Sequence, residues 1–107
     1  MMETIGTEWN SKKVMAGIVL YNPDMERLMQ NVDAVKRQVS KIVLVDNGSK
    51  ILPRLDIFNS TDIEYIQNKK NIGIACALNQ IMKYANDNGY DWVLTLDQDS
   101  VVSDNIM

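Results

Sequence analysis

Two aspartates, Asp97 and Asp99, carry the sharpest chemical signal in this chain of 107 residues. They stand one residue apart, directly after the apolar run that ends at Leu96. Such carboxylate pairs bind hard divalent cations like Mg²⁺, which prefer oxygen ligands and often complete their shell with phosphates and water. Acidic residues after a strand are also common in solvated turns, so the spacing alone leaves both interpretations open.

The composition excludes several other kinds of chemistry. The chain has no histidine and one cysteine, which rules out Ser-His-Asp and Cys-His nucleophile systems, histidine zinc sites and internal disulfides within it. A formal charge of −3 argues against a nucleic-acid partner. No apolar run approaches the roughly 18–20 residues of a membrane span, and the polar N-terminus does not resemble a signal peptide. We therefore expect a cytoplasmic protein.

Four segments predict strands: the first two are apolar runs rich in β-branched residues, which a parallel sheet would bury, the third is weaker, and the fourth is apolar again. They cover residues 14–21, 42–45, 63–66 and 92–96. A mixed crossover is expected from residue 50 to about 61, where Pro53 interrupts any regular element.

Two amphipathic helices are expected between these strands. The first has apolar positions from Met25 to Val39 at steps of three and four, with Asn22 as its cap, Pro23 at its first position, and Met25 and Met29 in the core. The second follows Asn71 and stops at Asn88-Gly89. Its expected buried stripe is Ile74, Leu78, Ile81, Met82 and Ala85, with Cys76 as a small buried packing residue.

This alternation predicts an α/β fold: a parallel sheet with helices on both faces, in one domain over residues 14–107 after an arm of residues 1–13. The carboxyl ends of parallel strands share one edge, where open α/β sheets bind ligands. The predicted edge collects Tyr21, Asn22, Asp46, Asn47, the Asn68–Asn71 loop, Asp97 and Asp99.

Two familiar ligand loops do not fit this edge. An EF-hand reading of Asp97 and Asp99 fails because Val101 and Val102 occupy the next ligand and glycine positions. Asp46 stands where dinucleotide-binding folds place a ribose-binding acid, but the turn after the first strand lacks the glycines of a pyrophosphate cradle. No Walker sequence is present.

Four motifs in order resemble the inverting family 2 glycosyltransferases of GT-A fold. They are Tyr21-Asn22 after the first strand, Val45-Asp46-Asn47-Gly48-Ser49, Asn71-Ile72-Gly73-Ile74-Ala75 running to Asn79, and Leu96-Asp97-Gln98-Asp99-Ser100. The last is particularly similar to the bacterial rhamnosyltransferase branch. The resemblance spans about residues 14–100 and implies the Rossmann-like N-terminal half of a GT-A fold.

The resemblance also implies a nucleotide-sugar site. Tyr21 would lie by the base, with Asn22 beside it, and Asp46 would accept a hydrogen bond from the imide N–H of uracil or thymine. Asn71 and Gly73 would border the nucleotide. Each has a plainer interpretation, which stays open: Tyr21 as a core aromatic, Asp46 as part of a turn, and Asn71 as a helix cap.

In the same resemblance Asp97 would reach the ribose or base. Asp99, together with Asp97, would hold a divalent metal, Mg²⁺ or Mn²⁺, that bridges the donor diphosphate. The metal would offset the charge that grows on the leaving nucleoside diphosphate.

As a whole, the resemblance implies metal-dependent, inverting transfer of a sugar from dTDP-rhamnose or a UDP-sugar to a cell-surface polysaccharide or lipid-linked glycan. The full enzyme would lie in the cytoplasm, with peripheral association at the inner face of the membrane. Family members continue past the position of Ser100 with the acceptor site and catalytic base. We therefore expect a donor-binding part without a catalytic residue, inactive alone and self-associating through exposed sheet edge. The alternative is a non-catalytic nucleotide- or metal-binding α/β module.

Overall fold

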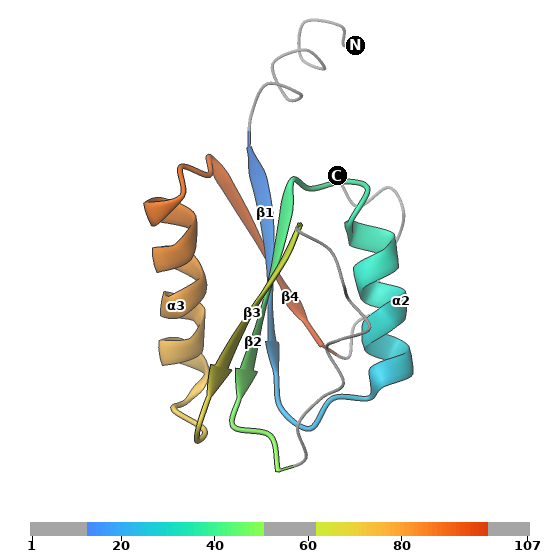
Figure 1. Cartoon of the computed structure of the whole chain (residues 1–107), viewed down its shortest axis with the longest axis vertical. Helices are drawn as coiled ribbons and strands as arrows, with labels where there is room; N and C mark the ends of the chain where they lie inside the picture. The colour runs from blue at the N-terminus through green and yellow to red at the C-terminus, as the bar shows by residue number, and fades with distance from the viewer. Residues whose placement is uncertain (1–12, 51–61, 99–107) are drawn as a thin grey trace, which may run out of the picture.

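Apolar strands and amphipathic helices alternate along the chain, and the computed structural model, which describes residues 13–50 and 62–98, assembles them into three layers (Figure 1). The elements are β1 (Val14–Leu20), α2 (Met25–Val35), β2 (Lys41–Asn47), β3 (Ile63–Asn68), α3 (Ile74–Asp87) and β4 (Trp92–Asp97). The four strands pair in the order β3-β2-β1-β4, and every pair is parallel. With α2 on one face and α3 on the other, the predicted α/β fold is confirmed.

The core lies on both faces of the two central strands. Side chains of β1 and β2 alternate between a cluster under α2, which includes Ile18 and Leu44, and a cluster under α3, which includes Val45. Gly17 of β1 allows close packing, because a Cβ there would lie 2.4 Å from Cγ2 of Ile81 in α3. The absence of a side chain at one central position thus sets how near α3 approaches the sheet.

The start of α2 differs from the sequence prediction. Its cap is Asp24, whose Oδ1 accepts hydrogen bonds from the N–H groups of Glu26 at 3.1 Å and Arg27 at 3.3 Å. Asn22 has a φ of +46°, which does not suit the extended conformation of a cap residue. The helix ends at Val35, and Met29 is 44% exposed, so its predicted place in the core is wrong.

The buried face of α3 is also rotated from the predicted stripe. The buried residues are Ala77, Ile81 and Ala85, whose small alanines let the helix lie close to the sheet. Ile74 and Met82 are 61% and 46% exposed, and Cys76, expected inside, is exposed as well.

Several sequence predictions fall on residues that the structure does not describe. These are the arm except for its last residue, Lys13, nearly all of the 50–61 crossover, and Asp99. Among the residues that are described, no helix is long and apolar enough to cross a membrane.

Candidate functional site

The carboxyl ends of the four strands meet at one edge, drawn at the bottom of Figure 1. In the strand register Leu20 pairs with Asp46, Val19 with Asp97, and Asn47 with Asn68. The structure therefore brings the ends of β1, β2 and β4 together as predicted, although they are far apart in the sequence.

Asp46, at the end of β2, is fully buried and bonded to Ser49. Its Oδ2 accepts from the Ser49 N–H at 3.2 Å, and its Oδ1 accepts from the Ser49 hydroxyl. A turn held by an aspartate side chain in this way is typical of Asp-Asn-Gly-Ser sequences. The turn and the edge position thus coexist, and a ligand could touch Asp46 only after the groups that cover it move apart.

Ser49 also connects this turn to the loop after β1. The Asn22 N–H donates to the Ser49 hydroxyl at 2.8 Å, and the Lys50 N–H donates to Asn22 Oδ1 at 2.8 Å. Tyr21 is 40% exposed, so it is not a core aromatic, and its side chain is accessible at the edge.

Asn47 fastens the loop that precedes α3. Its side chain is nearly buried, its Oδ1 accepts from the Ile72 N–H at 3.1 Å, and its Nδ2 donates to Asn71 Oδ1 at 3.1 Å. The same Nδ2 donates to the Gly73 carbonyl at 3.4 Å. One buried amide thereby joins β2 to the start of α3.

Two glycines shape these loops for different reasons. Gly73 caps α3 with a φ of +89°, and a Cβ there would meet nothing within 4 Å, so its backbone angle explains the residue. Gly48 has a φ of +80° and in addition lies against the next loop, because a Cβ would come within 2.4 Å of the Lys70 carbonyl carbon. Asn71 is not the cap, although its Oδ1 accepts from the Gly73 N–H at 2.8 Å.

The end of β4 is tied to the end of β1 through Gln98. The Tyr21 N–H donates to Gln98 Oε1 at 2.8 Å, and Gln98 Nε2 donates to the Tyr21 carbonyl at 3.0 Å. Asn31, fully buried on α2, donates through Nδ2 to the Gln98 carbonyl at 3.1 Å. Asp97 is the last residue of β4, and Asp99 lies outside the described residues.

The predicted metal ligands are Asp97 and Asp99, and Asp99 lies outside the described residues. Over the described ranges no group of three or more Asp, Glu, Cys or His residues is placed to hold a metal ion. The carboxylate of Asp46 is engaged by Ser49, and that of Asp24 caps α2. Carboxylate oxygens suit Mg²⁺ or Mn²⁺ by their chemistry, and the binding of such an ion by Asp97 and Asp99 stays a prediction.

Four polar residues hold the edge together through hydrogen bonds that the sequence pattern did not predict. Ser49, Asn47 and Gln98 belong to the quoted motifs, but their bonds join segments distant in the sequence. Asn31 did leave a signal, because a single amide at that position interrupts the apolar face of α2 between Leu28 and Val35. A polar residue on a buried stripe requires a partner, and here the partner is the Gln98 carbonyl.

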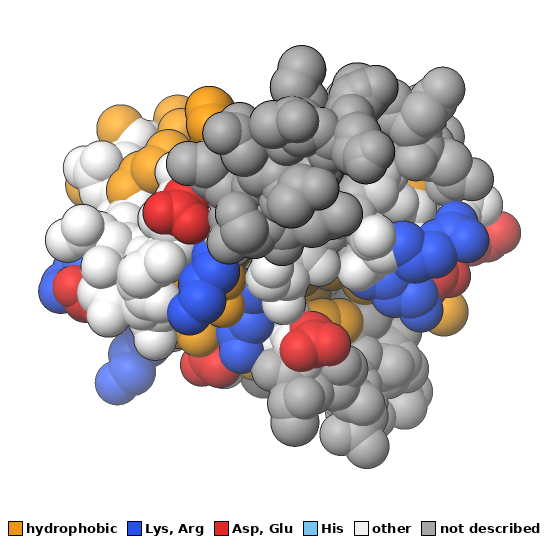
Figure 2. All heavy atoms as spheres, turned by 90° about the horizontal axis from the view of Figure 1, so that it is seen from above, with side chains coloured by type: hydrophobic (Ala, Val, Ile, Leu, Met, Phe, Trp, Pro, Cys, Tyr) orange, Lys and Arg blue, Asp and Glu red, His pale blue; other side chains and the backbone are white. Residues whose placement is uncertain are grey.

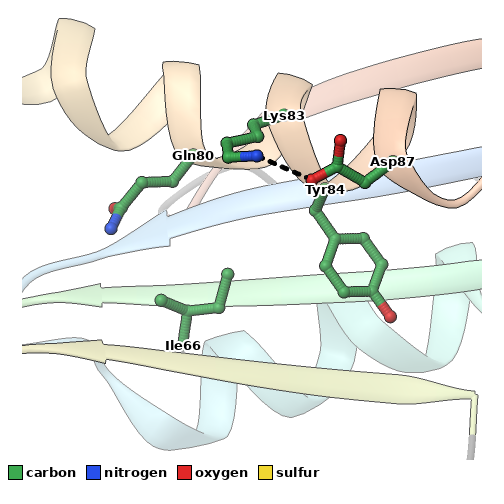
Figure 3. Close-up of a pocket in the computed structure, with 5 residues that line it drawn as sticks. All are labelled: Ile66, Gln80, Lys83, Tyr84 and Asp87. Carbon is green, nitrogen blue, oxygen red and sulfur yellow. Dashed lines mark hydrogen bonds and ion pairs between the residues drawn. The ribbon is translucent and has the colours of Figure 1, made fainter.

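Two shallow hollows flank α3. One, of about 220 Å³, lies between α3 and β3 and is lined by Ile66, Gln80, Lys83, Tyr84 and Asp87 (Figure 3). In it Lys83 reaches along the helix to Asp87, 2.8 Å away, and this hydrogen bond raises the pKa of Lys83. The other, of about 230 Å³, lies beside the carboxyl edge and is lined by Val19, Ile74, Leu78, Thr95 and Leu96.

Comparison with known proteins agrees with this arrangement. The family model described as glycosyl transferase family 2 matches residues 16–106. The chain is also 29% identical over 90 residues to the dTDP-rhamnosyl transferase RfbF of Shigella flexneri. That alignment covers 84% of this chain and 30% of the relative, so the chain spans less than a third of the length of the curated protein it matches.

Proposed function

The chain belongs to glycosyl transferase family 2, and we propose that it is the donor-binding part of a rhamnosyltransferase that takes its sugar from a thymidine or uridine diphosphate. The observation that carries this proposal is the shared edge of three neighbouring strands, where Tyr21 follows β1, Asp46 is next to last in β2 and Asp97 ends β4. Similarity to a dTDP-rhamnosyl transferase supports the choice of donor. The acceptor would be a cell-surface polysaccharide or a lipid-linked glycan.

In this proposal different residues of the edge bind different parts of the donor. The exposed ring of Tyr21 lies against the base, and Asp46 accepts from the imide N–H once the cover over it opens. Asn22, Asn71 and Gly73 border the nucleotide. Asp97 and Asp99 hold Mg²⁺ or Mn²⁺, which when bound neutralises charge on the diphosphate leaving group.

Calorimetry of the purified chain with UDP and dTDP, with and without Mn²⁺, tests the proposal. We expect metal-dependent binding of both nucleotides, little binding of ADP, and at least a tenfold loss of affinity in Asp99→Ala. Asp33→Ala is the control, because Asp33 is an exposed residue of α2 whose ion pair is with Lys36. A wild-type chain that binds neither nucleotide, or an Asp99→Ala variant that binds as well as wild type, would contradict it.

We further propose that the chain does not transfer sugar by itself, since none of its residues is assigned as the base that deprotonates the acceptor. Turnover of a nucleotide sugar with a supplied acceptor by the purified chain would overturn this point. Nucleotide binding without turnover in a longer form that spans the whole relative would instead favour the non-catalytic binding module.

Self-association is part of the same proposal. The β4 flank consists of Ile74 and Met82 of α3, which are 61% and 46% exposed, the residues of the second hollow, and Trp92, 52% exposed, which the strand register places on the α2 face of this edge strand. Figure 2, which looks onto the amino ends of the strands, shows hydrophobic side chains gathered on the side of α3. Residues 92–96 carry no charge or proline, which are the usual protections of an edge strand. This flank is where we expect a second copy to bind.

A further inference from the structure

Gln98 makes a contact with main-chain atoms that are 77 positions away in the sequence. Its carboxamide accepts from the Tyr21 N–H at 2.8 Å and donates to the Tyr21 carbonyl at 3.0 Å, both ordinary hydrogen-bond lengths. Because the contact is with backbone, it fixes where the chain at Tyr21 lies rather than how its ring is turned.

The main chain at Gln98 is hydrogen-bonded to a residue of α2. Asn31 is fully buried, and its Nδ2 donates to the Gln98 carbonyl at 3.1 Å. A buried amide without a partner is costly, and no buried side-chain nitrogen or oxygen in the described ranges is without one. The position of the turn after β4 is therefore set by the core.

The loop after β1 is held from its other side by β2. The Asn22 N–H donates to the Ser49 hydroxyl, which in turn donates to Asp46. Tyr21 and Asn22 thus lie between two fixed points, Gln98 at the end of β4 and Ser49 after β2.

We propose that Gln98 is a positioning residue that holds the carboxyl end of β4 at a fixed place relative to Tyr21, so that base binding and diphosphate binding reinforce each other. The proposal rests on the proposed function, in which Tyr21 contacts the base and the two aspartates serve the diphosphate. Gln98 itself contacts main chain and needs no contact with the donor.

Gln98→Met tests the role, because methionine has nearly the same length, has no donor for the Tyr21 carbonyl, and offers the Tyr21 N–H only a weak sulfur acceptor. Gln98→Asn keeps the carboxamide on a side chain one methylene shorter, which cannot span both Tyr21 atoms. Gln30→Met, at an exposed glutamine of α2, is the matched control.

The first measurement is hydrogen exchange without ligand. In Gln98→Met and Gln98→Asn the Tyr21 amide should exchange at least tenfold faster, whereas the Ile18 amide, inside β1, should keep its wild-type rate. Wild-type exchange at Tyr21 in both variants would show that the contact does not hold the two strand ends together, and would overturn the proposal.

The second measurement is the affinity for dTDP relative to dTMP, each with Mn²⁺. Loss of positioning should lower the dTDP-to-dTMP ratio at least fivefold in both Gln98 variants and leave it unchanged in Gln30→Met. Equal losses for the two nucleotides, as from a merely structural role, or an unchanged ratio would overturn the proposal. A wild-type chain that binds neither nucleotide would overturn the proposed function and the coupling with it, while the exchange result would still report on the contact.

Discussion

The two strands that flank β1, β2 and β4, differ in how far the described residues bury them and pair with their edges. β2 has a strand on each side and six consecutive buried residues from Ile42 to Asn47. Its last two side chains, Asp46 and Asn47, form hydrogen bonds with Ser49 and with Ile72 of the following loops. β4 has a described partner on one side only; Trp92 and Thr95 are exposed, and its remaining apolar residues are half-buried. Within the described residues β2 is thus covered on both edges, whereas the β4 flank has apolar surface left to bury.

If the loops on the β2 side pack closely, stability should be most sensitive to substitution at their closest backbone contact, that of Gly48 with Lys70. Gly48→Ala combines a φ of +80° with a Cβ 2.4 Å from the Lys70 carbonyl carbon, so we expect a loss of about 3 kcal/mol in the free energy of unfolding. Urea denaturation measures it. Gly89→Ala is the control, because its φ is +74° but no atom lies within 4 Å of the new Cβ; about 1 kcal/mol is expected there. Equal losses would show that the contact between the loops is not tight.

The polar end of β2 gives the next largest effect. Asn47→Ala removes the acceptor of the Ile72 N–H and the donor to Asn71, and should cost about 2 kcal/mol. Asn86→Ala, at an exposed position of α3, should change stability by less than about 0.5 kcal/mol. Thermal or urea unfolding compares the two, and a loss at Asn47 no larger than at Asn86 would mean that the start of α3 does not depend on this amide.

On the β4 flank, substitution should affect association more than folding. Met82→Lys places a charge on α3 next to exposed apolar residues and should weaken self-association at least tenfold, about 1.4 kcal/mol. Met29→Lys is closely matched, since Met29 and Met82 are 44% and 46% exposed on opposite faces of the sheet. Sedimentation equilibrium distinguishes them. A monomeric wild-type chain, or equal weakening by both substitutions, would remove the contrast between the two flanks.

The smallest expected effect is a pH dependence on the β2 side. Burial, and next the negative charge of Asp46, raise the pKa of Tyr65 above its ordinary value of 10.0. The unfolded chain therefore ionises first, and stability that is complete below about pH 10 falls as the pH rises further. Tyr65→Phe should reduce this alkaline loss, seen as a shallower fall of the melting temperature. Part of the loss should remain, because burial also raises the pKa of Tyr90. An unchanged slope would contradict the assignment.

The sequence was sufficient to predict the strands, their parallel orientation and the edge where their carboxyl ends meet. These features depend on local patterns: short apolar runs make strands, and alternation with helices makes the sheet parallel. The structure confirms the strands to within two residues at each end, and α3 ends at Asp87 with Asn88 as its cap, as the Asn88-Gly89 signal predicts.

What could not be predicted depends on contacts between distant segments. Asn22 is a good cap by residue type, but its bonds to the Ser49 turn accompany a positive φ, and Asp24 takes the role. The apolar positions of α3 are spread too widely around the helix to show which of them face the sheet. The hydrogen-bond partners of Gln98 and Asn31 could not be predicted either, because they are distant in the sequence and residue spacing does not indicate them.

The hydrogen bonds between Gln98 and Tyr21 have a consequence for how far the sheet extends. A carboxamide is chemically a peptide group carried on a side chain, so Gln98 presents to Tyr21 the donor and acceptor that a neighbouring strand would present. Beyond the last β1–β4 pair, Val19 with Asp97, the two strands thereby gain one further hydrogen-bonded step at Tyr21. A glutamine between two aspartates in the sequence therefore lengthens the sheet by one step.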